Sequence, residues 1–314
     1  MSKHKKQHFV PACYSKAWKD PDSPQNQTPY IWIFDKDGSN PRRKAPENAF
    51  HETDLYTISG PDGDRNLVLE KGLCQLEYEF NRVRNSKLNF RRELSPEDQI
   101  VLCAFAAAAQ VRTPAMRDHQ REQFRRPLEM MEKMTARLDA MTEEEKTVFI
   151  SRQPPSLSEK SSGLDYQAIK AMHETPLQML LAPMVQTLTP LLCKLDMALL
   201  LTDDDIGFIT SDHPCVWFDP EGYKRPPMYR SPALIYETIE ITLPLSPSCM
   251  LMLNRQGVSG YIEVDRKTVT ELNRRTRGFA SDYFVVHRNH VEPIWLDEGK
   301  EPDDSWDKLH PRPA

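Results

Sequence analysis

The sequence predicts an α+β fold, in which a central helical bundle packs against a mixed or antiparallel sheet built from the N-terminal and C-terminal parts. Two observations carry this prediction. The middle of the chain, about residues 66–195, holds long stretches with apolar residues at helical spacing. Short β-branched and aromatic runs lie on either side, at 30–34 and across about 196–290. Because this order is typical of the α+β class, we expect the outer parts to share a sheet with helices on one side.

The ends of the chain are expected to lie outside this arrangement. We predict a flexible N-terminus, 1–7, and an acidic, proline-containing peripheral tail, 291–314. The N-terminus is basic but has no apolar stretch, so we expect no secretory signal and a cytoplasmic protein. The strongest membrane-span candidate, 179–201, is too interrupted to cross a bilayer, because it contains Pro183, Pro190, Lys194 and Asp196.

The composition limits the classes of function. Of the 314 residues, 39% are hydrophobic and 28% charged, as in soluble globular proteins. The net charge of -5 argues against non-specific coating of nucleic acid, although it leaves room for a local basic site. The six cysteines are scattered without a C-x-x-C pair. We therefore expect reduced thiols rather than a disulfide framework or a zinc cluster.

The ordered chain is expected to begin at His8-Phe-Val-Pro11. Pro11 suits the first turn of a short helix that places Tyr14 and Trp18 on one side. His8 would precede the positive end of this helix, which disfavours an imidazolium. A neutral imidazole suits a general base or metal ligand, and the alternative is a structural histidine that ties down the N-terminus.

Two short strands, 30–34 and 55–58, are predicted next, and a polar cluster lies before the second. His51 and Asp54 have the spacing of half a metal site, without a third ligand nearby in the sequence. A helix is then predicted over 66–84. Its Glu77 lies at the edge of an apolar face, where a carboxylate is either solvated or the partner of a buried arginine.

The most apolar helix is predicted over 95–113. Ser95 is a good N-cap and Pro96 suits the first helical position. Pro114 cannot donate to the carbonyl of Gln110, so the helix ends or kinks there and redirects Arg112 and Arg117.

The rest of the helical middle is more polar. Arg117, Arg121 and Arg125 form a stripe, which suits either a phosphate-binding ridge or a solvated helix surface. We expect helices at 115–141, 142–150, 164–181 and 183–195, with a linker at 153–163.

The last third is predicted to be mostly β. Its first two strands would form a hairpin around the acidic residues 203–205. Strands are expected at 197–202, 207–210, 216–218, 236–243, 250–254, 262–264 and 283–287, with a helix at 267–277.

A second polar focus follows the strand at 207–210. Ser211, Asp212 and His213 precede Pro214, which places them on a rigid loop where binding sites are common. The alternative is a turn in which Ser211 and Asp212 hydrogen-bond the local backbone. The sequence contains no G-x-S-x-G, P-loop, G-x-G-x-x-G or H-E-x-x-H motif, which removes most common cofactor enzymes.

These motifs together resemble a family. The chain is similar to a bacterial domain-of-unknown-function family marked by an N-terminal His-(Tyr/Phe)-Val-Pro motif, an Arg-Thr-Pro motif and a Ser-Asp-x-Pro motif. The matching stretches, in order, are His8 to Pro11 with Tyr14, Asp54 to Tyr56, Glu77, Gln110 to Pro114 with Arg117, Ser211 to Pro214, and Leu243 to Pro247. The resemblance implies a single long domain, 8–290, and a shared set of polar residues, but no reaction.

One hypothesis is an enzyme, a hydrolase that acts on a phosphodiester or nucleotide substrate. Its arginines would hold phosphate oxygens, since electrostatic stabilisation is usually the largest catalytic term. A divalent Mg or Mn ion would be a candidate cofactor, and nucleic acid or a nucleotide the partner. The catalytic candidates are His8, Glu77 and Asp212, and the substrate-binding candidates are Tyr14, Gln110, Arg112, Arg117 and Ser211.

The alternative is a non-catalytic sensor or protein-interaction module, in which Arg112, Glu77 and Asp212 form an ion-pair network. A structural subunit of a larger assembly is a third hypothesis. Geometry separates the first two, because a catalytic set meets in an open cleft whereas a network satisfies its own charges in a closed interior.

Overall fold

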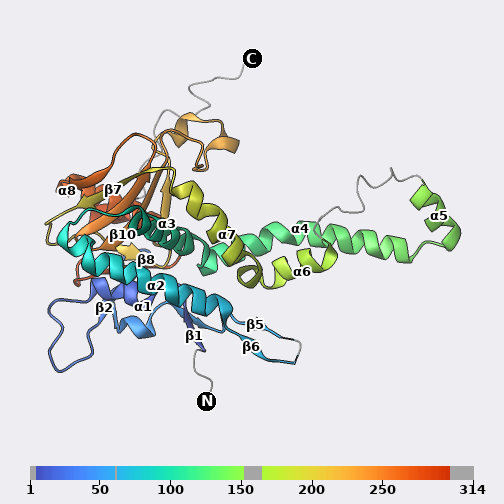
Figure 1. Cartoon of the computed structure of the whole chain (residues 1–314), viewed down its shortest axis with the longest axis horizontal. Coiled ribbons are helices and arrows are strands. Elements are labelled where there is room, and N and C mark those ends of the chain that lie inside the picture. The colour runs from blue at the N-terminus through green and yellow to red at the C-terminus, as the bar shows by residue number, and fades with distance from the viewer. Residues whose placement is uncertain (1–4, 61, 152–164, 298–314) are drawn as a thin grey trace.

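The computed structural model describes residues 5–60, 62–151 and 165–297. It consists of a body that contains the sheets and a helical arm that projects from it (Figure 1). The helices are α1 (Ala12–Ser15), α2 (Val68–Ser86), α3 (Pro96–Val111), α4 (Pro114–Asp139), α5 (Glu143–Ser151), α6 (Tyr166–Glu174), α7 (Pro176–Leu192) and α8 (Arg266–Phe279). The predicted linker at 153–163 lies outside the described residues.

Two larger sheets form the body, and both agree with the predicted α+β class. A five-stranded sheet has the order β12 (Gly260–Glu263), β7 (Asp196–Leu201), β11 (Cys249–Asn254), β10 (Glu240–Ser246) and β9 (Val216–Phe218). It is mixed, because β12 runs parallel to β7 and the other pairs are antiparallel. The second sheet has the order β3 (Arg42–Lys44), β2 (Ile31–Asp35), β13 (Tyr283–Val286) and β8 (Thr210–Ser211).

The second sheet confirms that the two ends of the chain share a sheet, since β2 pairs with both β3 and β13. Two small ribbons complete the strands. They are β1 (Lys6–His8) with β4 (His51–Thr53), and β5 (Ile58–Ser59) with β6 (Arg65–Asn66).

The five-stranded sheet is covered on both faces, so the helices do not all lie on one side. On β7, Leu199 and Leu201 join the main core with α1, α2 and α3. Their neighbours Ala198 and Leu200 point to the opposite face, where Val269 of α8 packs. This alternation follows from the two-residue period of a strand.

An aromatic cluster fixes α1 between the helices and the sheets. Phe80 of α2 and Phe105 of α3 stack with ring centroids 3.8 Å apart. Trp18 and Tyr14 are fully buried beside them, and the Trp18 ring N–H donates to the carbonyl of Phe208 at 2.8 Å. The Tyr14 hydroxyl donates to the carbonyl of Pro244 in β10 at 2.7 Å.

The boundaries of α3 follow the predicted signals. Ser95 caps the helix by accepting from the backbone N–H of Asp98, and the Asp98 carboxylate accepts in return from the N–H of Ser95. At the other end Pro114 stops α3 and starts α4, because the Thr113 side chain caps the new helix through the N–H of Met116. The chain therefore turns at Pro114 without an unstructured loop.

The predicted helix break at Pro183 is wrong. The break lies at Thr175, and α7 runs through both Pro183 and Pro190. Both prolines lie on the exposed side of the helix, so the carbonyl groups that they leave without an N–H partner face water.

The predicted hairpin around residues 203–205 is also wrong. β7 lies in the five-stranded sheet and β8 in the four-stranded sheet, so the acidic turn connects two sheets. The strand predicted at 55–58 is mostly a turn: Asp54 has a φ of 57°, and Leu55 and Tyr56 point into the core.

Both predicted peripheral ends are partly ordered into the body. Lys6 and Gln7 belong to β1, and Gln7 is fully buried, so the flexible N-terminus does not extend to residue 7. Trp295 is buried in a cluster with Phe34 and Phe284, so the predicted tail begins with a residue of the core. Residues 1–4 and 298–314 lie outside the described residues.

The connection between the two sheets depends on Gly207, and this can be tested. Gly207 has a φ of 61°, and a Cβ there would clash with the carbonyl of Pro247, which accepts the N–H of Phe208 at 2.7 Å. Gly207→Ala should lower the free energy of unfolding by about 3 kcal/mol, the sum of the left-handed cost and the clash. Denaturant unfolding measures it.

Gly257→Ala is the matched control, because Gly257 has a φ of 76° but no heavy atom within 4 Å of the added Cβ. It should cost only about 1 kcal/mol. Equal losses for the two variants would show that the contact with Pro247 does not constrain the connection.

Candidate functional site

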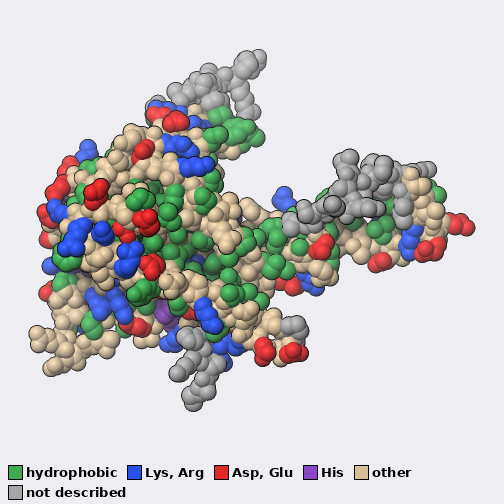
Figure 2. All heavy atoms as spheres, viewed as in Figure 1, with side chains coloured by type: hydrophobic (Ala, Val, Ile, Leu, Met, Phe, Trp, Pro, Cys, Tyr) green, Lys and Arg blue, Asp and Glu red, His purple; other side chains and the backbone are tan. Residues whose placement is uncertain are grey.

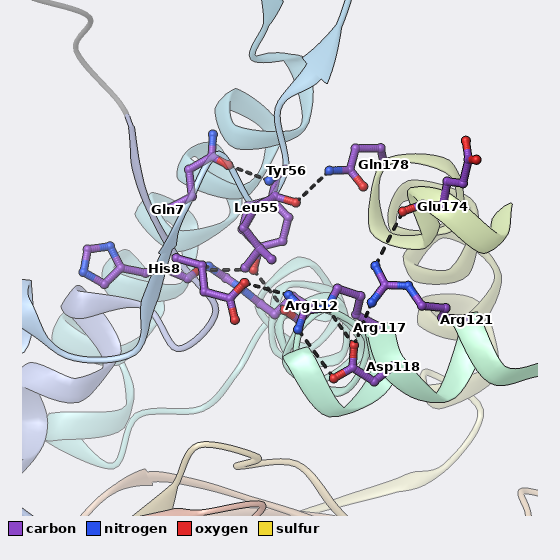
Figure 3. Close-up of polar contacts among 11 residues, drawn as sticks. Gln7, His8, Leu55, Tyr56, Arg112, Arg117, Asp118, Arg121, Glu174 and Gln178 are labelled. Atoms are coloured by element: carbon purple, nitrogen blue, oxygen red, sulfur yellow. Dashed lines mark hydrogen bonds and ion pairs between the residues drawn. The ribbon is translucent and has the colours of Figure 1, made fainter. Parts of the chain in front are cut away.

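The sequence-predicted residues meet most closely around Arg112, which ends α3. Its side chain is only 3% exposed. Its guanidinium donates to the carboxylate of Glu77 in α2 at 3.0 Å and to the backbone carbonyl of His8 in β1. Figure 3 shows this arginine between the N-terminal strand and the ring of Tyr56. The arginine thus joins three segments that are distant in the sequence.

Tyr56 completes the enclosure of Arg112. Its hydroxyl donates to the backbone carbonyl of Arg112 at 3.0 Å, and its ring lies 5.8 Å from the guanidinium carbon. Its backbone N–H donates to the side-chain oxygen of Gln7, and the Gln7 amide donates to the Thr57 hydroxyl at 3.0 Å. Burial raises the pKa of Tyr56 to about 12, so the phenol stays protonated and remains a donor.

Glu77 lies between a cation and a thiol. One carboxylate oxygen accepts from Arg112, and the other accepts from the Cys13 thiol at 3.7 Å. Burial and the nearby Glu77 charge raise the pKa of Cys13 to about 11, so the thiol stays protonated. Burial lowers the pKa of Arg112, but Tyr56 and Glu77 outweigh it and keep the pKa above its ordinary value. Arg112 therefore carries a fixed positive charge that Glu77 balances.

His8 enters the network through its backbone rather than through its ring. Its carbonyl accepts from Arg112, whereas its Nε2 lies 3.3 Å from the carbonyl of Glu47. The ring packs edge-on against His51, with centroids 5.5 Å apart. Burial is the largest influence on the His8 pKa and holds it below its ordinary value. Burial thus favours the neutral imidazole, and the ring interacts with the Glu47 carbonyl and His51, whereas the His8 carbonyl binds Arg112.

Arg117 and Arg121 fix the first turns of α4 instead of forming an open ridge. Arg117 donates to Glu52 of β4 at 2.6 Å and to Asp118 at 2.9 Å. Arg121 lies near the backbone carbonyls of His173 and Glu174, at 3.4 and 3.5 Å, where α6 ends (Figure 3). Cations near a helix C-terminus are favourable because the terminal carbonyls carry partial negative charge.

Ser211 and Asp212 belong to a different part of the body. Both oxygens of Asp212 accept backbone N–H groups, from Ser281, Asp282 and Tyr283, at 2.7–3.0 Å. Ser211 accepts the N–H of His213 at 3.1 Å, which is the local turn that the sequence left as an alternative. Burial raises the pKa of Asp212, although the three N–H donors oppose this. Asp212 therefore fixes the start of β13 and does not join Arg112.

The remaining candidates have separate roles. Tyr14 links α1 to the sheets, because its hydroxyl also lies 2.6 Å from the Thr210 hydroxyl. The side-chain oxygen of Gln110 is buried without a hydrogen-bond partner in the described part of the chain, as is the Nε of Arg112. His51 and Asp54 do not form half a metal site: Asp54 pairs with Arg65, and the described residues hold no group of three metal-ligating side chains.

Sequence reasoning missed two members of the network, Gln7 and Cys13. Gln7 falls in the predicted flexible N-terminus, 1–7. The residues before the His8 motif are polar and contain no glycine or proline, which is compatible with a strand. For Cys13 the sequence predicts only a reduced thiol. Its position between Pro11 and Tyr14 on a very short helix was the available signal that its side chain lies against the next helix.

The fold and the site define an α+β protein in which a buried ion-pair network connects the body to a helical arm. The chain belongs to a family described as a protein family of unknown function, DUF4238, whose model matches residues 6–290. This confirms the resemblance to a domain of unknown function. No curated protein and no solved structure matches the chain. A search of the described helices for one that is long and apolar enough to cross a membrane finds none.

The buried imidazole of His8 predicts a pH dependence of stability. A pKa lowered on folding means that the unfolded chain binds the proton more readily, so stability falls as pH drops below about 6.5, the ordinary histidine pKa. His8→Gln should therefore reduce the slope of unfolding free energy against pH between about pH 6.5 and 5. Denaturant titrations across this range measure the slope.

Lowered pKa values are also found for His51, His213 and His287. Part of the slope of unfolding free energy against pH should therefore persist in His8→Gln. His119→Gln, at an exposed position of α4, is the control for replacing a histidine by glutamine. An unchanged slope in His8→Gln would mean that His8 titrates alike in the folded and unfolded chains.

Proposed function

We propose that the chain is a non-catalytic protein-interaction module, whose helical arm binds a partner protein and whose buried network fixes the base of the arm. One observation carries this proposal. Inside the body, the guanidinium of Arg112 is paired with Glu77 and hydrogen-bonded to the His8 carbonyl. Arg112 ends α3, just before α4 and the arm begin. A charge satisfied in this way is available to orient a structure rather than to hold a substrate.

The arm itself has the properties of an interaction element. α4 is 26 residues long, and α6 packs against its first part, as far as the contact between Tyr166 and Glu132. Farther out, α4 and α5 extend away from the body (Figure 1). Figure 2 shows apolar side chains among the charged ones along the arm. The exposed apolar residues there are Met130, Met134, Val148 and Phe149.

Methionine is suited to such a surface, because its flexible and polarizable side chain adapts to partners of different shape. Exposed apolar side chains that gather on a projecting element are typical of protein-binding surfaces. The partner that this chemistry favours is a protein with an apolar groove that accepts a helix.

Contacts on several sides hold the base of the arm. Arg117 reaches β4, and Arg121 reaches the end of α6. Gln178 of α7 donates to the backbone carbonyl of Leu55, next to the Tyr56 that encloses Arg112. These contacts resist rotation of α4 against the body, so the arm presents its surface in a defined direction.

The enzyme hypothesis fits these contacts less well. It assigns phosphate oxygens to Arg112, whose side chain is buried and already donates to two protein oxygens. It also assigns a catalytic role to Asp212, but the Asp212 carboxylate accepts the backbone N–H groups of residues 281–283. Phosphate recognition needs donors that a substrate can reach.

The structural role of the network predicts a loss of stability on substitution. Arg112→Ala should lower the free energy of unfolding by about 3 kcal/mol, because Glu77 is left without its cation. Glu77→Ala should also destabilise, and the double variant should lose less than the sum of the single changes. Denaturant unfolding of the four proteins measures the coupling.

Arg125→Ala is the matched control, since Arg125 pairs with Glu122 on the solvated surface of α4. It should leave the unfolding midpoint close to that of the wild type. If Arg112→Ala unfolds at the wild-type midpoint, Arg112 is not structural and the catalytic hypothesis regains its basis.

The arm should contact a partner inside the cell. A photo-reactive amino acid in place of Met134, which is 53% exposed, should give a cross-linked species of discrete mass when the chain is produced in its native cells. Gel mobility and mass spectrometry identify it. Met130→Glu should remove the product, because a charge next to the contact disfavours an apolar interface.

The control is the same photo-reactive residue at Met228, which is 79% exposed but lies on the body. Identical products from the two positions, or persistence of the Met134 product in Met130→Glu, would contradict an interaction surface on the arm.

A further inference from the structure

A cavity of about 740 Å³ lies on the body, away from the Arg112 network. Its walls come from α3, the end of α7, β7 and β12. Its lining combines apolar residues such as Leu195 with polar residues such as Gln99 and Ser259. Two cysteines, Cys103 and Cys193, also line it.

These two thiols come from helices that pack directly against each other. Cys103 lies in the apolar part of α3 and is only 1% exposed, whereas Cys193 follows the last residue of α7 and is exposed. Both are free thiols that line the same cavity, and Cys193 lies near enough to Cys103 to raise its pKa. The alanine residues around Cys103 explain the proximity, because small side chains let the two helix backbones approach closely.

We propose that Cys103 and Cys193 are a reversible dithiol–disulfide pair, oxidised by a small-molecule disulfide that reaches Cys193 at the cavity. The inference goes beyond the interaction role of the arm and does not depend on it. It assigns the cavity a class of reactant, low-molecular-weight thiols and disulfides, and assigns the body a covalent link between α3 and the end of α7.

The chemistry proceeds in two exchanges. In the first, the thiolate of Cys193 attacks one sulfur of the small disulfide, whose S–S bond breaks to release one thiolate, which takes up a proton. In the second, the thiolate of Cys103 attacks the Cys193 sulfur of this mixed disulfide and releases the second small thiol. The protein thiols together lose two electrons and two protons, and the small disulfide gains them.

The order of attack follows from access. Cys193 is exposed and Cys103 is buried, so the small disulfide meets Cys193 first. Burial and the neighbouring Cys193 raise the pKa of Cys103, so few Cys103 thiolates exist at neutral pH. Ring closure should therefore be the slower exchange, and its rate should rise with pH.

The other cysteines lack this arrangement. Cys13 donates to Glu77, Cys215 is buried just before β9, and Cys249 is buried at the start of β11. Cys74 is exposed on α2, where the neighbours that act on its pKa are Glu70, Glu77 and Arg112 rather than a cysteine. Cys74 is therefore the control for simple exposure: it should form a mixed disulfide but no internal one.

The test uses the full chain, incubated at pH 8 (roughly the pKa of a free cysteine) with graded ratios of reduced to oxidised glutathione. Free thiols are then alkylated and the digest is examined by mass spectrometry. We expect a Cys103–Cys193 linked peptide that disappears on reduction, while Cys74 carries only a glutathionyl group. Cys103→Ser should accumulate the glutathionyl adduct on Cys193, and Cys193→Ser should leave Cys103 free.

The melting temperature and the position of the glutathionyl adduct decide the outcome. The oxidised wild type should melt at a higher temperature than the reduced form, and Cys193→Ser should show no such difference, because a crosslink constrains the unfolded chain. A stable glutathionyl adduct on Cys193 of the wild type, with Cys103 still open to alkylation after unfolding, would overturn the proposal. Exclusive links between two chains would overturn it as well.

Discussion

The ion pair of Arg112 and Glu77 is the constraint around which the rest of the body is arranged. A guanidinium removed from water is tolerated only when an anion and hydrogen-bond acceptors surround it. Glu77 supplies the anion from α2, and β1 supplies the His8 carbonyl. To present that carbonyl, β1 must pair with β4 and Gln7 must be buried against the turn at Tyr56. The N-terminal segment is thus ordered by a charge that lies on the end of α3.

The same pair also defines where the arm begins. Arg112 closes α3, Thr113 caps α4, and Pro114 takes the first position of α4, where its missing N–H costs nothing. Because Tyr56 holds the Arg112 carbonyl from one side and Arg117 holds Glu52 from another, the corner is fixed within a few residues. A long helix that stands away from the body gains little from its own packing, so its direction depends on this corner.

Local signals allowed part of the fold to be predicted. The limits of α3 follow from Ser95, Pro96 and Pro114, whose effects act within one helical turn. The prolines of α7 misled the prediction because their cost depends on which face meets water, and the sequence does not show that face by itself. The hairpin at 203–205 failed for a related reason: the predicted strands at 197–202 and 207–210 are both largely apolar and close in sequence, but tertiary packing places β7 and β8 in separate sheets.

The candidate site was harder to predict because its side chains bind backbone groups. Asp212 accepts three N–H groups of residues 281–283, and Arg112 and Tyr56 both bind backbone carbonyls. Every residue carries such groups, so a sequence gives no indication of which of them lies nearby. A polar motif that fixes a distant backbone segment has the same residue types as one that binds a substrate. Geometry separates them, since the fixing side chain is enclosed and paired with protein groups, as the Arg112 guanidinium is with Glu77 and the His8 carbonyl, whereas a binding side chain keeps a donor or acceptor within reach of solvent.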